Sequence, residues 1–286
     1  MIRTQRPHLG LGTYTHPGLS GKTNEDRLAV ASFQGASGRP VLFVVVSDGI
    51  GGHQAGEVAA ALTVKTVVEH VAGSDGAEPV RIMEAAIHAA SHAIFQQAAA
   101  RMDQTGMGST CACAWIEGDR LYTAYVGDSR IYLVREGRLI RTSVDHTWIQ
   151  EALEKGIITP DEVLGNLNAH VLRRHLGGVE PPLVDTRLRL SSTENDARAR
   201  ANQGLPLRSA DIVLLCSDGL TDMVRDEEIL QVITARHGLK SAAEALVNCA
   251  NENGGRDNTT VVLIGRPRPM VRTTSKRGVL STFPGR

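Results

Sequence analysis

The chain has 286 residues, of which 42% are hydrophobic, and its 31 Lys and Arg residues balance 31 Asp and Glu residues. A formal net charge of zero gives no overall field that would attract nucleic acid or an anionic membrane, so neither is an expected partner. The longest apolar runs are far shorter than the roughly 18 residues of a membrane span, and the N-terminal stretch lacks a signal-peptide core. We therefore expect a cytoplasmic protein, with a chain long enough to bury about three quarters of its unfolded surface.

The first strand-like runs in the chain each adjoin acidic residues. Residues 28–33 follow Glu25 and Asp26, and residues 41–46 are six consecutive apolar residues rich in β-branched types. The second run predicts a short buried strand that ends at Asp48. Glu25 and Asp26 alone would fit a solvated turn; beside the other carboxylates they are candidates for contact with a metal through water or through another ligand.

Glycines follow Asp48 directly, at positions 49, 51 and 52. They allow the backbone to turn sharply, so that a carbonyl and a carboxylate can point at the same place. Hard divalent cations are usually held in this way. The end of this strand is therefore the first candidate metal site.

Two stretches with helical periodicity come next. Residues 57–71 place apolar side chains on one side of a helix, with Lys65 and Glu69 on the other. Residues 82–94 repeat apolar side chains at steps of three and four. Both stretches predict amphipathic helices that cover a sheet.

Residues 108–142 change to a period of two. Two glycine-containing turns divide this stretch into strands at 111–116, 121–126 and 131–134. The pattern predicts an antiparallel meander, with Asp128 at one of its junctions.

The four cysteines do not suggest a metal site. Cys111 and Cys113 occupy alternate positions of one expected strand, and Cys216 and Cys249 are isolated. A single CxC pair has no second pair to complete a zinc site. We therefore expect free, buried thiols.

The middle of the chain returns to helical and irregular character. Within residues 145–178 we expect a helix around 149–155 and a helix start at 159–162. Residues 193–209 are polar, charged and rich in turn residues. They predict a mobile surface loop, to which we assign no chemistry.

A second apolar run, residues 212–216, leads to Asp218 and repeats the pattern at Asp48, and Asp257 comes just before the strand-like residues 259–264. Asp and Gly are the commonest turn residues, so each motif alone fits an ordinary turn. Four acid and glycine motifs in one chain, three of them adjoining apolar runs, favour convergence on divalent metal instead.

The last part of the chain predicts two helices and a tail. We expect a capped helix at 226–236 and a second helix at 241–251, which carries the reciprocal capping pattern of Ser241 and Glu244. Residues 266–286 contain six Lys or Arg residues and no acid, and we expect a flexible basic tail there. Strands in two antiparallel sets with pairs of helices between them indicate an α+β fold of two stacked sheets with helices outside.

Six motifs occur in a fixed order, and together they resemble a known family. They are GKTNEDR, VVSDGIGGHQAGE, GSTCACAWI, AYVGDSRIYL, LLCSDGL and GGRDNTTVV. The chain resembles the bacterial stand-alone type 2C protein phosphatases of the metal-dependent PPM family over residues 10–264. The resemblance implies one domain over residues 1–265, a four-layer α-β-β-α sandwich with two central antiparallel β-sheets, and metals in a cleft at one edge.

By this similarity, Asp48 would bridge two Mn²⁺ or Mg²⁺ ions. The Gly49 carbonyl would complete one ion, and Asp218 and Asp257 would hold the other. Asp128 with Asp218 resembles the weaker third-metal site of bacterial members. Packed carboxylates raise one another's pKa unless cations compensate them, and oxygen-only ligation suits Mg²⁺ or Mn²⁺ rather than Zn²⁺.

The implied activity is hydrolysis of phosphoserine and phosphothreonine in proteins. Two ions roughly 3.5 to 4 Å apart can activate a bridging water for direct in-line attack, without a phosphoenzyme. Asp48, Asp218 and Asp257 are the candidate catalytic residues. The implied partners are phosphorylated proteins, among them substrates of a Ser/Thr kinase, and we expect a monomer.

Two positions depart from the family pattern. Gly21 stands where the family has a phosphate-binding arginine, and the neighbouring Lys22 could bind phosphate only as a point charge. Ile50 stands where eukaryotic relatives carry a histidine that is thought to protonate the leaving group. No general acid is therefore assigned, with a metal-bound water as the default and His53 as a weaker candidate.

Two other functions compete with the phosphoprotein phosphatase. Gly21 and Ile50 would fit a catalytically silent regulatory or binding module on the same fold, although intact Asp48, Asp218 and Asp257 argue against it. Metal-dependent hydrolysis of small phosphate esters or nucleotides also fits the motifs.

Overall fold

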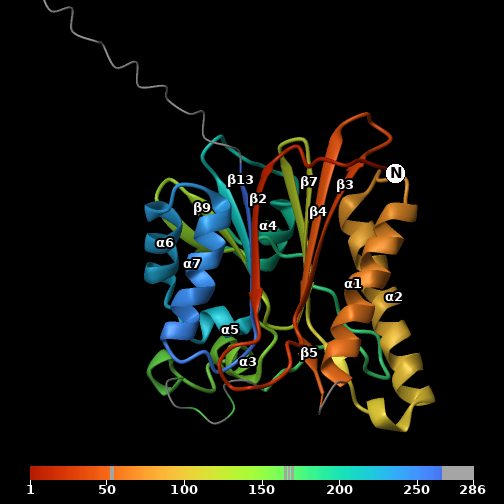
Figure 1. The fold of residues 1–286 in the computed structure, drawn as a ribbon, viewed down its shortest axis with the longest axis vertical. Coiled ribbons are helices and arrows are strands. Elements are labelled where there is room, and N and C mark those ends of the chain that lie inside the picture. Colours follow the sequence, from red (N-terminus) through yellow and green to blue (C-terminus); the bar gives the residue numbers. More distant parts are fainter. Residues whose placement is uncertain (52–54, 164–165, 167, 169–170, 266–286) are drawn as a thin grey trace, which may run out of the picture.

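Two antiparallel β-sheets stack face to face, and a pair of helices covers the outer face of each (Figure 1). The computed structural model describes residues 1–51, 55–163, 166, 168 and 171–265. The predicted α+β class and the four-layer α-β-β-α sandwich are confirmed. The predicted tail at 266–286 and His53 lie outside the described residues.

The first sheet has six strands in the order β1-β3-β4-β7-β8-β11. Its strands are β1 (Ile2–Arg3), β3 (Arg27–Gln34), β4 (Pro40–Ser47), β7 (Cys111–Glu117), β8 (Arg120–Val126) and β11 (Leu205–Pro206). The helices α1 (Ala55–Gly73) and α2 (Pro79–Ala100) pack on its outer face. They are joined to β7 by the short helix η1 (Met102–Gln104) and by β6 (Gly108–Ser109), which pairs with β5 (Gly49–Ile50).

The second sheet has five strands in the order β10-β9-β12-β13-β2. Its strands are β2 (Gly10–His16), β9 (Arg130–Arg135), β10 (Arg138–Arg141), β12 (Ile212–Cys216) and β13 (Thr259–Gly265). Helices α6 (Asp226–Ala235) and α7 (Leu239–Glu252) cover it. The remaining helices are α3 (Trp148–Glu154), η2 (Pro160–Glu162), α4 (Asp196–Ala201) and α5 (Asp218–Thr221).

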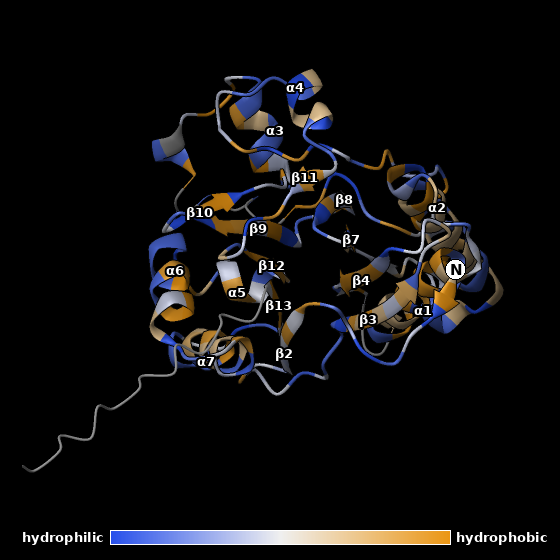
Figure 2. Ribbon diagram, turned by 90° about the horizontal axis from the view of Figure 1, so that it is seen from above, coloured by the Kyte–Doolittle hydropathy of each residue, from blue (hydrophilic) through white to orange (hydrophobic). Residues whose placement is uncertain are grey.

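The position of strand β4 in the fold explains why its sequence is continuously apolar. Leu42, Val44 and Val46 point into the core between the sheets, whereas Phe43 and Val45 point toward α1 and α2. A strand buried on both faces has no polar side and therefore reads as an unbroken apolar run. Figure 2 shows the two sheets between the helix pairs.

No helix in the described ranges combines the length and the hydropathy that a bilayer crossing requires. All four thiols are free, as predicted, although Cys249 is only half-buried.

The predicted meander is wrong at its second junction. Strands β7 and β8 form the expected hairpin, but β9 pairs with β10 and β12 in the other sheet. The chain crosses between the sheets at residues 127–129, where Gly127 has a φ of 104°. Alternation of apolar residues predicts that a strand has a buried face, but not which sheet it joins.

The predicted mobile loop at 193–209 is also wrong, because it contains α4 and β11. The Asn195 side chain caps α4 by accepting a hydrogen bond from the N–H of Arg198 at 2.9 Å. Ala199 is fully buried, and Leu205 of β11 pairs with Leu121 of β8. The segment is polar on one side only, and its few apolar residues fix it to the sandwich.

Three helix termini differ in detail from prediction. Helix α7 begins at Leu239, before Ser241, whose hydroxyl donates to the carbonyls of His237 and Gly238. The predicted capping box is therefore absent at Ser241. Helix α6 begins without a side-chain cap, and the expected helix start at 159–162 is a single turn.

Candidate metal centre

Strand registers bring the predicted aspartates to one edge of the sandwich. In the six-stranded sheet, Arg27 at the start of β3 pairs with Ser47 at the end of β4. In the five-stranded sheet, Arg130 at the start of β9 pairs with Cys216 at the end of β12. The carboxylates within two residues of strand ends at this edge are Asp26, Asp48, Asp128, Asp218 and Asp257.

Thr110 fixes the backbone of Asp48 immediately after β4. The Asp48 N–H donates to the Thr110 hydroxyl at 2.9 Å, and the Thr110 N–H donates to the Asp48 carbonyl at 2.8 Å. The same hydroxyl lies 2.7 Å from that of Ser129, the neighbour of Asp128. One threonine side chain therefore connects the segments that carry Asp48 and Asp128.

Asp26 joins the two sheets from inside the site. It is 2% exposed, and its Oδ2 accepts a hydrogen bond from the Ser217 hydroxyl at 2.6 Å. Ser217 in turn accepts from the N–H of Thr260 on β13 at 2.9 Å. Ser217 therefore ties Asp26 to the segment that leads into Asp218.

Asp218 and Asp257 line one cavity of about 320 Å³. Asp218 begins α5, two residues after the end of β12, and Asp257 comes two residues before β13. Asp222 and Arg256 also line this cavity. The two predicted ligands from distant parts of the chain thus face the same space, together with a third carboxylate.

Burial and mutual repulsion act together on these acids. Burial is the largest cause that raises the pKa of Asp48, followed by the charges of Asp26, Asp218 and Asp128. Burial, followed by the charges of Asp218 and Asp145, raises the pKa of Asp128 well above its usual value. Burial also raises the pKa of Asp26 to about 7. Cations placed among these groups would restore their ionised forms.

The donor set fits hard divalent cations. In the described ranges no three His, Cys, Asp or Glu side chains already enclose one point, so the acids gather without closing into a cage. The predicted ligand atoms are all oxygens, the kind that Mg²⁺ and Mn²⁺ prefer. The Oδ1 of Asp26 is buried and has no hydrogen-bond partner in the described part of the chain, so the cluster lacks a positive group or donor at this atom.

Glu25 lies near Asp257 of the acidic edge, and Lys22 lies near Glu25. The Glu25 N–H donates to the Asn258 side chain at 2.7 Å. Its pKa is raised first by burial and then by Asp257, and it is lowered by the charge of Lys22. Lys22 is exposed and close enough for its charge to act on Glu25, whereas Gly21 has a φ of 78°, a conformation that would strain an arginine.

Gly49 is required by close packing at the start of α1. A Cβ at Gly49 would lie 2.1 Å from the carbonyl oxygen of Gly56. Gly49 does not adopt a positive φ. The glycine therefore permits a close backbone approach here, rather than the sharp turn expected from the sequence. The role of its carbonyl as a metal ligand stays a prediction.

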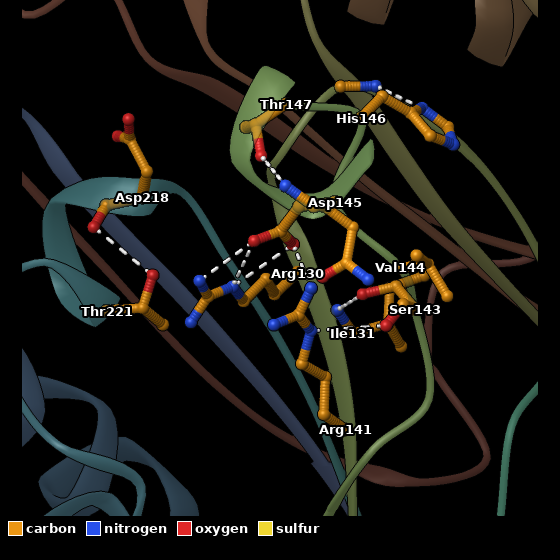
Figure 3. A network of polar contacts seen from close by, with 12 residues as sticks. Arg130, Ile131, Arg141, Ser143, Val144, Asp145, His146, Thr147, Asp218 and Thr221 are labelled. Carbon is orange, nitrogen blue, oxygen red and sulfur yellow. Dashed lines mark hydrogen bonds and ion pairs between the residues drawn. The ribbon is translucent and has the colours of Figure 1, made fainter. Parts of the chain in front are cut away.

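An ion-pair network supports the segment that carries Asp128. Asp145 lies between Arg130 and Arg141, at 2.8 Å from Arg130 Nη2 and 2.7 Å from Arg141 Nη2 (Figure 3). Arg130 follows Asp128 by two residues. The network therefore fixes the chain directly after residues 127–129, the segment that crosses between the sheets and carries Asp128.

His146 holds the same crossing from the other side. The backbone N–H of His146 donates to the Gly127 carbonyl at 3.0 Å, and its ring Nδ1 accepts from the backbone N–H of Gly127 at 3.0 Å. Because Nδ1 accepts, Nε2 carries the proton and donates to Asp185 at 3.2 Å. Burial lowers the pKa of His146, which is consistent with a neutral ring.

Sequence reasoning missed several residues of this edge. Asp222 follows Asp218 by four residues, a spacing that places both on one side of a helix and could have been noticed. Thr110, Asn258 and Ser217 act through hydrogen bonds to distant segments. No local pattern marks such residues, because their partners are set by the fold.

Comparisons with known proteins agree with this geometry. The family profile described as Protein phosphatase 2C matches residues 18–261. The serine/threonine protein phosphatase PstP of Mycobacterium tuberculosis is 36% identical over 222 residues, which cover 77% of this chain. The match spans only 39% of the length of that relative. The serine/threonine phosphatase stp of Listeria welshimeri is 32% identical over 85% of this chain and 90% of its own.

Solved structures share the fold. The catalytic domain of PstP in complex with two manganese ions superposes with a TM-score of 0.72 at 32% identity, covering 90% of this chain and 97% of that domain. The match extends through both sheets and their helix pairs, so the resemblance applies to the whole sandwich.

Proposed function

The chain belongs to the protein phosphatase 2C family, and we propose that it is a Mn²⁺- or Mg²⁺-dependent phosphatase acting on phosphoserine and phosphothreonine in proteins. The observation that carries this proposal is the gathering of buried aspartates at one sandwich edge, where burial and repulsion raise the pKa values of Asp48 and Asp128. A related phosphatase domain that holds two manganese ions supports the choice of metal.

The proposed ligands follow the positions of the acids. Asp48 occupies the central place, Gly49 contributes its carbonyl, and Asp218 and Asp257 act from the shared cavity. Asp128 joins Asp218 at a third, weaker site. Glu25 and Asp26 act through water or through hydrogen bonds. Divalent cations held by these residues would supply Lewis acidity for the phosphoryl oxygens and would lower the pKa of the attacking water.

The chain's own residues bind and orient the substrate. Lys22 attracts the substrate phosphate with its ammonium group, which acts as a point charge. The ionised Asp48, Asp218 and Asp257 fix the ions in place, so the attacking water and the phosphorus are aligned before reaction. Ile50 has no proton to give, so the leaving serine or threonine oxygen takes its proton from water.

The experiment that tests the proposal is hydrolysis of p-nitrophenyl phosphate and of a phosphothreonine peptide. EDTA should abolish both activities and Mn²⁺ should restore them, because the acids alone cannot activate water. The Asp48→Asn variant should fail with both substrates. Hydrolysis that EDTA leaves unchanged would contradict the proposal.

Two further measurements separate the alternatives. A silent binding module should take up little Mn²⁺ in a calorimetric titration, whereas the proposed enzyme should bind at least two ions. A panel of nucleotides and sugar phosphates beside phosphopeptides addresses small esters; preference for the small esters would favour that alternative. A Ser/Thr kinase partner, the monomeric state and the cytoplasmic location stay predictions.

A further inference from the structure

A groove of about 560 Å³ lies on the surface beside the ion pairs that support Asp128. One wall is the edge strand β10 with the residues that follow it, and the other is the segment 189–192. Gln150 of α3 closes one part of it. None of the predicted metal ligands lines this groove.

The charge of the groove lining has one sign. Its eleven residues include Arg138, Arg141 and Arg189 and no acid. Two glutamates near the rim are already engaged: Glu154 accepts from the Gln150 side chain, and Glu194 accepts from the Leu190 N–H. Anions are therefore the ligands that this lining favours.

Each of the three arginines retains donors for a ligand. Arg138 is exposed, and its side chain makes no ion pair in the described ranges. Arg141 and Arg189 each pair with one carboxylate, those of Asp145 at 2.7 Å and Asp196 at 3.1 Å. A guanidinium has five N–H donors, and the buried Nε of Arg189 has no hydrogen-bond partner in the part of the chain that the structure describes.

The shape of the groove favours an extended peptide over a free anion. Strand β10 is the edge of its sheet, so its outer backbone groups are not used by another strand of the described chain. Edge strands commonly receive extended peptides by adding a strand. Leu139, Ile140 and Leu190 add apolar surface between the arginines, which suits the methylene groups of a side chain.

The groove is also close to the proposed catalytic edge. Arg141 lines the groove and pairs with Asp145, which pairs with Arg130, two residues after Asp128 (Figure 3). We propose that the groove binds an anionic side chain of the phosphoprotein substrate, an acidic or second phosphorylated residue separate from the one hydrolysed. This inference rests on the proposed phosphatase function, and it assigns a substrate preference to that function.

The test uses the full chain and matched phosphothreonine peptides. One series carries three Glu residues at successive positions on either side of the phosphothreonine, and the other carries Gln at the same positions. Binding is measured by fluorescence anisotropy of labelled peptides in EDTA, and kcat/KM is measured with Mn²⁺. At low salt, one placement of Glu should improve kcat/KM about fivefold to tenfold through KM, as for one charge-assisted contact.

Three variants locate the effect. Arg138→Glu and Arg189→Gln should remove the advantage of Glu over Gln and leave p-nitrophenyl phosphate hydrolysis unchanged. Arg200→Glu is the matched control, because Arg200 is exposed on α4 and does not line the groove. Equal losses in Arg138→Glu and Arg200→Glu would overturn the proposal in favour of a general charge effect.

Other outcomes are equally decisive. Equal binding of all Glu and Gln peptides to the wild-type chain would overturn the proposal. So would sulfate binding that depends on Arg138 without any peptide preference, since the groove would then hold a free anion. Peptide binding that depends on Arg138, in a protein without Mn²⁺-dependent hydrolysis, would support the groove and reject the phosphatase function.

Discussion

Two neighbouring groups of aspartates are buried to a similar extent but differ in what neutralises them. Asp26 and Asp128 at the acidic edge are 2% and 8% exposed, and their pKa values are raised, first by burial. Asp185 is 4% exposed, and hydrogen bonds from His146 and Arg187 lower its pKa despite burial. Hydrogen bonds and cations from the chain therefore outweigh burial at Asp185, but they do not outweigh it at Asp26 and Asp128.

The difference separates an acid that the chain neutralises itself from acids that it leaves without sufficient positive charge. An ionised carboxylate without a partner is costly in a low-dielectric interior, so a folded protein normally pairs it or keeps it protonated. Arg187 donates to Asp185 through Nε at 2.8 Å and to Asp196 through Nη1 at 3.0 Å. At the acidic edge the neighbouring acids repel instead, which is the arrangement expected where cations come from solution.

The largest expected effect comes from Asp48→Asn. Hydrolysis of p-nitrophenyl phosphate with Mn²⁺ should fall by roughly a thousandfold or more, because the proposed central metal ligand is lost. The same change should raise the melting temperature in EDTA, since it removes a repulsive carboxylate from beside Asp26 and Asp218. If Asp48→Asn instead melts lower in EDTA, the acidic edge would be a structural cluster and the comparison would break.

Arg187→Met should have the second largest effect, and on stability. Removing one partner of a buried pair leaves an uncompensated charge at Asp185, so the free energy of unfolding in urea should fall by about 3 kcal/mol. Arg208→Met is the matched control, because Arg208 pairs with Glu136 at an exposed site and should change stability by less than about 1 kcal/mol. Similar losses in both variants would contradict the assignment of Asp185 as an internally neutralised acid.

The acidic edge was largely predictable from the sequence, because its information is local. Asp48 and Asp218 each follow an apolar run, and a strand must end where its apolar residues end. Adjacent glycine and acid residues then indicate a turn that carries carboxylates. The ordered motifs were enough to predict the fold class and the shared edge, although the ligand roles themselves stay predictions.

The segment of Asp196 and the ion pairs of Asp145 and Asp185 were not predictable in the same way. The segment with Asp196 reads as a charged loop, because its charges hide the cap at Asn195 and the buried Ala199. The pairing of Asp145 with Arg130 depends on which sheet β9 joins, and an alternating pattern does not specify that. Long-range ion pairs leave no periodic mark in a sequence, so only the fold reveals them.

Asp128→Ala should have a moderate effect. If Asp128 serves only a third, weaker site, turnover should fall by about tenfold while calorimetry still detects the two tight Mn²⁺ ions, a loss of about 1.4 kcal/mol in transition-state stabilisation. Asp119→Ala, at an exposed position outside the groove, is a matched surface control. Unchanged turnover would assign Asp128 to structure, and loss of tight binding would place it among the main ligands.

The smallest expected effect is a dependence of stability on pH. Asp26 has a raised pKa of about 7, against 3.8 when unfolded, so in EDTA its contribution to stability is present below pH 4 and is lost as pH rises toward 7. His146 acts in the opposite direction, because burial lowers its pKa and stability is lost as pH falls below 6.5. Urea unfolding of Asp26→Asn against wild type isolates the carboxyl.

The wild type should therefore lose at least about 1 kcal/mol relative to Asp26→Asn between pH 4.5 and pH 7 in EDTA. Saturating Mn²⁺ should reduce this loss, because bound cations favour the ionised acids, and the stabilisation that Mn²⁺ gives should grow with pH over the same range. A pH dependence that is identical with EDTA and with Mn²⁺ would mean that cations do not reach the buried acids. Asp26 would then not be an acid that cations from solution neutralise, and the proposed difference from Asp185 would be wrong.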